Sequence, residues 1–168
     1  MGLDPLFQRL YDTPMAVAIR ESGTLFPWIE SVHVLSITLV VGSIAVVDLR
    51  LLGVAWTGRS ISRLTREILP FTWTVFGLAA ITGSLLFSSN AVKYTHNTFF
   101  LSKMALLVLA GVNMLAFHFL TSRDMERWDE AHHHQLPFAV KLAGGFSLLL
   151  WLAVIVCGRW IGFTMSAF

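Results

Sequence analysis

Four long stretches of the chain contain no Asp, Glu, Lys or Arg, and the charged residues gather between them. About 20 apolar residues cross the hydrocarbon core of a bilayer as a helix, so each stretch with its flanks predicts one span. Strands are excluded because an open sheet leaves backbone groups unsatisfied in lipid and these runs are too long for barrel strands. We therefore predict an all-α, integral membrane four-helix bundle, with spans at approximately 27–50, 68–88, 99–121 and 138–160.

The N-terminal segment has a different pattern, in which apolar Leu6, Phe7 and Leu10 are mixed with charged Arg9 and Asp12. This mixture is typical of a short helix that lies on the membrane surface. The segment has neither the leading basic cluster nor the uninterrupted apolar core of a signal peptide. We expect residues 1–22 to be interfacial and residues 1–168 to form a single transmembrane domain.

Composition narrows the class of protein further. Of the 168 residues, 55% are hydrophobic and only 13% are charged, about half the charged share of a soluble globular domain. That balance excludes a nucleic-acid-binding protein and an ordinary soluble enzyme, and it makes the lipid bilayer the first expected partner. The single Cys157 cannot form an internal disulfide or a multi-cysteine metal site.

The distribution of basic residues predicts the orientation. Cytoplasmic connections carry an excess of Lys and Arg. Seven of the twelve basic residues lie in or beside the first and third connections. The first connection holds Arg50, Arg59, Arg63 and Arg66, the third holds Arg123 and Arg127, and Lys141 lies just beyond the third. We therefore expect these connections in the cytoplasm and both termini in the periplasm, in a bacterial inner (cytoplasmic) membrane.

Ionisable side chains inside a span are costly, so each one requires a reason. Glu30 and His33 are spaced i,i+3 near the start of the first span and share a helical face. A carboxylate in that position either fixes the ring of a metal-ligating histidine or makes a structural hydrogen bond. Around the third span, the helical period places His96, Lys103 and His118 in one stripe about 80° wide.

Depth limits which of these residues can act together. The first and third spans run in the same direction. Aligning Asp48 with His118 by depth places His33 level with Lys103 and leaves His96 about 10 Å nearer the surface. A His33–His96 pair therefore requires a tilted cofactor, a tilted helix or an unwound start of the third span. His118 lies about 33 Å beyond His96 along a helix, so it cannot bind the same metal as His33. It is kept as an alternative metal ligand.

Two further features have competing interpretations. Small residues occur in every span, including Gly42, Gly77 and Gly83, and they indicate either close helix packing or room for a flat cofactor. The run His132–His134 resembles a metal-binding tract. Successive helical residues point about 100° apart, however, and so favour an ordinary soluble connection.

The segment from His33 to Gly53 resembles the first span of an uncharacterised family of small bacterial four-span membrane proteins. Its ending Asp48-Leu-Arg-Leu-Leu-Gly53 is the most distinctive part. The family has no assigned activity. More distantly, the chain is similar to the copper-resistance D-type membrane domain and to the membrane-bound protoporphyrinogen oxidase family. Both tend to carry a His followed by a Gly about nine residues later, here His33 and Gly42, and a Lys followed by a His, here Lys103 and His118.

These resemblances imply a haem b or copper site in the outer leaflet. His33 would be the first ligand and His96 the second, Lys103 would pair with a propionate or an anionic quinone head group, and Glu30 would be a second-sphere acceptor. Neutral imidazole binds both iron and copper. The resulting hypothesis is a b-type cytochrome-like oxidoreductase component that transfers electrons between a periplasmic partner and the quinone pool. A copper-handling protein and a non-catalytic subunit of a homo-oligomer are the alternatives.

Overall fold

The computed structural model describes residues 4–121 and 136–166, in which every regular element is a helix. The elements are α1 (Asp4–Tyr11), α2 (Pro14–Glu21), α3 (Leu25–Leu52), α4 (Ile61–Ser89), α5 (Ala91–Thr95), α6 (Thr98–Thr121) and α8 (Phe138–Ser166). The predicted all-α bundle with a short N-terminal helix before it is confirmed. The run His132–His134 lies outside the described residues.

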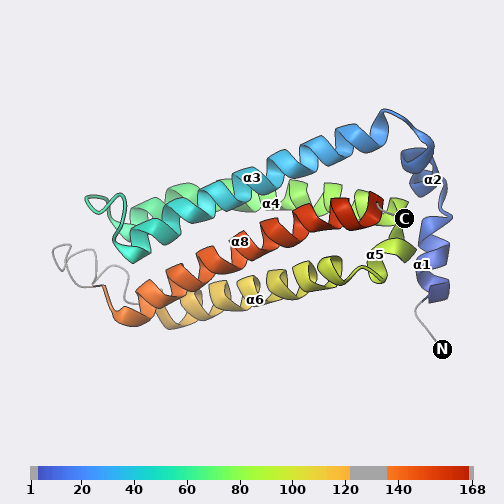
Figure 1. The fold of residues 1–168 in the computed structure, drawn as a ribbon. Helices are drawn as coiled ribbons and strands as arrows, with labels where there is room; N and C mark the ends of the chain where they lie inside the picture. The colour runs from blue at the N-terminus through green and yellow to red at the C-terminus, as the bar shows by residue number, and fades with distance from the viewer. Residues whose placement is uncertain (1–3, 122–135, 167–168) are drawn as a thin grey trace.

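Four helices, α3, α4, α6 and α8, are long and apolar enough to cross a membrane, and they lie side by side (Figure 1). With 28 residues, α3 is about 42 Å long, whereas the hydrocarbon core of a bilayer is about 30 Å thick. The helix ends therefore extend into the head-group regions. For the same reason, α4 begins at Ile61, seven residues before the expected span.

Local capping determines where these helices begin and end. Gly53 has a φ of 75°, in the left-handed region that favours glycine, and it ends α3. Ser60 Oγ accepts a hydrogen bond from the Arg63 N–H and begins α4. Asn97 Oδ1 accepts one from the Phe100 N–H and begins α6. His96 precedes that cap, so the prediction that it shares a helical stripe with Lys103 is wrong.

The four long helices have an unequal pattern of packing. α3 packs against both α4 and α8, and α6 packs against α8. The backbones of α4 and α6 lie further apart within the described residues, although Phe87 of α4 stacks on Phe100 of α6 with ring centres 5.4 Å apart. α3 and α8 approach each other closely at Gly144, where an added Cβ would lie 3.1 Å from both the Asp48 carbonyl oxygen and Leu51 Cβ. The spatial order is therefore α4–α3–α8–α6, with α3 and α8 central.

The short helices α1, α2 and α5 lie together at one end of the bundle, which we call the capped end (Figure 1). Arg20 joins them to α4, because its guanidinium donates to the carbonyl oxygens of Tyr11 and Ser89 at 3.2 and 3.1 Å. The same guanidinium lies 3.8 Å from the centre of the Tyr11 ring. We call the opposite end, with the connection between α3 and α4, the loop end.

Candidate functional site

His33 projects from α3 toward α4, where its ring is held at one nitrogen. Nδ1 lies 3.0 Å from the Ala79 carbonyl oxygen and 3.0 Å from Thr82 Oγ1. A carbonyl oxygen only accepts, so Nδ1 carries the proton and donates it. The Thr82 hydroxyl donates to the Leu78 carbonyl oxygen at 2.8 Å and can therefore accept from His33. Nε2 is then the nitrogen with a free lone pair, and it has no hydrogen-bond partner among the described residues.

Gly83 provides the space for this imidazole. A Cβ added at Gly83 would lie 2.9 Å from His33 Cε1, closer than real Cβ atoms approach. The next nearest atoms would be the two ring nitrogens, at 3.5 and 3.7 Å. The ring therefore packs directly on the α4 backbone. Of the two interpretations of the small residues, close packing accounts for this glycine.

Lys103 enters the same part of the bundle from α6. Its Nζ lies against Gly158 of α8, where an added Cβ would be 3.8 Å away. Lys103 is within electrostatic range of both His33 and Cys157. The lysine is half-buried, and no carboxylate in the described part of the chain forms an ion pair with it. The structure thus brings His33 and Lys103 to one region and leaves the cation without a carboxylate partner.

Glu30 has a different position from the one expected. Its side chain is exposed, and the His33 nitrogen that it would have held is bonded to α4 instead. Glu30 acts electrostatically on Tyr94 of α5. Burial raises the pKa of the Tyr94 hydroxyl, and the nearby Glu30 carboxylate raises that pKa further. Tyr94 packs against Phe87 and Phe100, with ring centres 6.0 and 5.2 Å away.

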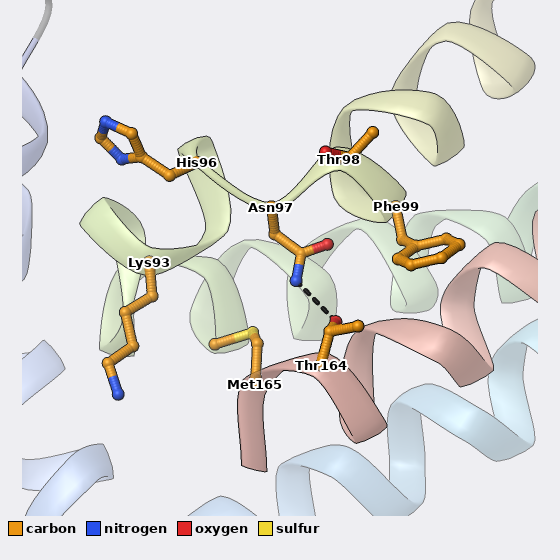
Figure 2. Close-up of a pocket in the computed structure, with 7 residues that line it drawn as sticks. All are labelled: Lys93, His96, Asn97, Thr98, Phe99, Thr164 and Met165. Carbon is orange, nitrogen blue, oxygen red and sulfur yellow. Dashed lines mark hydrogen bonds between the residues drawn. The ribbon is translucent and has the colours of Figure 1, made fainter. Parts of the chain in front are cut away.

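His96 is not brought to His33. It lies in the turn between α5 and α6, where its ring is exposed and its Nδ1 donates to the Val92 carbonyl oxygen at 2.9 Å. It lines a cavity of about 410 Å³ at the capped end, and His33 is not among the residues that line it (Figure 2). The unwound start of the third span is present, but it places His96 at the edge of this cavity (Figure 2).

No metal centre is formed by the described residues, since no three His, Cys, Asp or Glu side chains converge on one point. The backbone of His118 lies within α6, but its side chain is outside the described part of the structure. His33 and Lys103 are thus the two predicted site residues that lie together, and the choice of ligands stays a prediction.

Sequence reasoning missed the hydroxyl residues on the partner helix. Thr82 bonds His33, and nearly three helical turns further toward the loop end Thr72 donates to Ser43 Oγ at 2.8 Å. Ser36, between these two contacts on α3, is fully buried. The signal was present as polar residues at spacings of three and seven along the apolar stretches. A Ser or Thr hydroxyl can bond a carbonyl of its own helix, as Ser36, Ser43 and Thr82 do, so the spacing alone does not predict a contact between helices.

The fold and this site together define the class. The chain is a multi-pass membrane protein with four long apolar helices. Between them lie a half-buried histidine and a lysine that forms no ion pair with any described residue.

A family model described as a family of unknown function (DUF6644) matches residues 18–164, and the chain belongs to this family. Membership of an uncharacterised family, which the segment from His33 to Gly53 predicted, is thereby confirmed. No curated protein and no solved structure matches the chain significantly.

Proposed function

We propose that this protein binds haem b through Nε2 of His33 and transfers electrons between the quinone pool and a periplasmic partner. One observation carries the proposal, namely the hydrogen bond from His33 Nδ1–H to the Ala79 carbonyl oxygen. Metal-ligating histidines usually donate their second ring N–H to a carbonyl or a carboxylate, which fixes the tautomer and the ring orientation. His33 has this arrangement inside an apolar bundle.

The residues around His33 suit haem binding on the side of the haem where His33 would be the ligand. The donor set contains one imidazole, whose ring is oriented by Ala79, Thr82 and Gly83. A bound haem supplies one-electron chemistry. The chain contributes the ligand nitrogen and an apolar surrounding, because the neighbouring helix positions are filled with aliphatic and small side chains.

Lys103 supports the choice of haem over a bare metal ion. Haem carries two propionate carboxylates, and a lysine inside a bundle without a carboxylate partner is suited to neutralise an anion. In this role Lys103 orients the group and does not ligate iron. His96 does not serve as the second ligand in this arrangement, because it lies exposed in the α5–α6 turn at the capped end.

The proposal includes the inner membrane, with the capped end and both termini in the periplasm. Exposed Arg59, Arg63 and Arg66 lie at the loop end, and the buried Arg50 donates from Nε to the Arg59 carbonyl oxygen at 2.8 Å. An excess of arginine beside the first two spans favours that end for the cytoplasm.

The visible spectrum of the protein purified from cells supplied with a haem precursor tests the proposal. We expect a Soret band in the wild type, its loss in His33→Ala, and its retention in His96→Ala. Both variants remove an imidazole, but only the first removes the one held against α4. A wild type without a Soret band, or a band unchanged in His33→Ala, would refute haem binding through His33.

The same preparations separate the alternatives. Bound copper by elemental analysis, without a Soret band, would favour the copper-handling alternative. Protein that contains neither group, and that tolerates both His33→Ala and Lys103→Ala without loss of stability, would favour a non-catalytic subunit of an oligomer. In that case the polar residues serve only hydrogen bonds between helices.

A further inference from the structure

The cavity that His96 lines is formed by residues of α5, α6 and α8 and of the turn between α5 and α6. It is lined by Lys93, His96, Asn97, Thr98, Phe99, Thr164 and Met165. Asn97 Nδ2 donates to Thr164 Oγ1 at 2.8 Å and so ties the start of α6 to the last turns of α8 (Figure 2). Because Asn97 also caps α6, it fixes this part of the cavity lining to both α6 and α8.

The lining separates into a cationic side and an apolar side. Lys93 and His96 lie on one side of the cavity, and Phe99 lies across from them (Figure 2). Lys93 forms no ion pair within the described part of the chain. His96 Nδ1 donates to the Val92 carbonyl oxygen, so Lys93 is the group on this side that suits an anion. No acidic side chain lines the cavity, so its chemistry suits an anion with an apolar part attached.

Neighbouring aromatic residues place the cavity at the level of the bilayer interface. Phe99 stacks on Trp160 with ring centres 5.8 Å apart, and Trp160 contacts Phe163. Trp160 and Phe163 are both about half exposed. Tryptophan and other aromatic side chains at helix ends gather where head groups meet hydrocarbon. An anionic amphiphile at that depth is a phospholipid whose phosphate lies at the cationic side.

We propose that the cavity at the capped end binds the phosphate head group of an anionic phospholipid, with Lys93 as the cation that contacts the phosphate. The head group occupies the cavity, and the apolar part of the lipid lies along Phe99 and Met165. This site does not depend on haem binding at His33.

Native mass spectrometry of the detergent-purified full chain tests the site. Phosphatidylglycerol and phosphatidylcholine with identical acyl chains are added, and the retained lipid is compared. We expect the wild type to retain phosphatidylglycerol preferentially. Lys93→Gln should weaken that retention about fivefold, the effect of one basic residue near an anionic lipid. Thr98→Trp, which fills the cavity without changing its charge, should weaken it as well.

Arg66→Gln is the matched control, because it removes an exposed cation from the loop end. It should leave phosphatidylglycerol retention unchanged. Equal retention of the two lipids by the wild type would overturn the proposal, as would an equal loss in Lys93→Gln and Arg66→Gln. Displacement of the lipid by millimolar inorganic phosphate would overturn the assignment to a phospholipid.

Discussion

At the scale of single residues, the arrangement around His33 depends on a glycine, Gly83, on the neighbouring helix α4. Gly83 has no Cβ, so the imidazole can approach the α4 backbone closely enough to bond the Ala79 carbonyl oxygen. Helix packing in lipid gains from such small residues because it depends on close van der Waals contact. One added methyl group at this position therefore affects both the packing and the ring orientation.

We expect Gly83→Ala to destabilise the protein by about 1–3 kcal/mol, the usual cost of overpacking a tight contact. Gly77→Ala on the same helix should be neutral or slightly stabilising, since no atom lies within 4 Å of its added Cβ. Thermal unfolding in detergent measures both. If haem binds at His33, the Soret band of Gly83→Ala should also weaken or shift. Equal stability of the two variants would contradict the close contact.

Tyr94 offers a pH-dependent test of the packing at the capped end. In a Tyr11→Phe background it is the sole remaining tyrosine, and we expect its tyrosinate absorbance to rise with a midpoint above the ordinary pKa of about 10. Burial is the larger cause and the Glu30 carboxylate the smaller. Glu30→Gln should therefore lower the midpoint without returning it to the ordinary value. A midpoint that rises in Glu30→Gln would contradict the assigned charge effect.

At the scale of helices, one arginine joins the N-terminal short helices of the capped end to α4. Arg20 of α2 donates to backbone carbonyl oxygens of α1 and of the last residue of α4. A cation at a helix C-terminus is favourable because the final carbonyls lack partners within the helix. Ala16 and Ala91, which pack at this end, are fully buried. The short helices are therefore docked on the bundle by both packing and charge.

We expect Arg20→Ala to weaken this docking by about 2 kcal/mol, the usual value of hydrogen bonds to a charged group. Hydrogen exchange should show faster exchange in α1 and α2 with little change in the middle of α3. Arg9→Ala, which removes an exposed arginine of α1, is the control and should leave exchange unchanged. The same exchange in Arg20→Ala as in the wild type would show that packing alone holds the cap.

At the scale of the whole molecule, the two ends differ in construction. The capped end carries three short helices and the interfacial cavity, whereas the loop end carries exposed arginines beside the first two spans. His33, Lys103 and the cavity all belong to the half nearer the capped end. The orientation in the membrane therefore decides which compartment a redox partner of the site must occupy.

Thiol labelling in intact cells tests that orientation. In a Cys157→Ser background, Gly23→Cys places a thiol at the capped end and Gly58→Cys places one at the loop end, each with no atom within 4 Å of the new Cβ. A membrane-impermeant reagent should label Gly23→Cys in spheroplasts and should label Gly58→Cys only after permeabilisation. The reverse pattern would place the site and its redox partner on the cytoplasmic side.

The number and approximate extent of the long helices followed from the sequence alone, because the length of an apolar run is a local property that the bilayer thickness interprets directly. One short N-terminal helix was predicted from the mixture of apolar and charged residues, and the structure has two, α1 and α2. The depth match of His33 with Lys103 was a prediction from helix rise. Helix rise converts residue number into depth without any knowledge of neighbours.

Only the tertiary structure decided which atoms meet. The bond from His33 to Ala79 and Thr82 depends on the register of α3 against α4, and the place of His96 depends on Asn97, which caps α6 and bonds Thr164 of α8. Register and crossing angle arise from the fit of side chains on separate helices, and no local pattern encodes that fit. For this reason the bundle could be predicted from the sequence, while the partners of its polar residues could not.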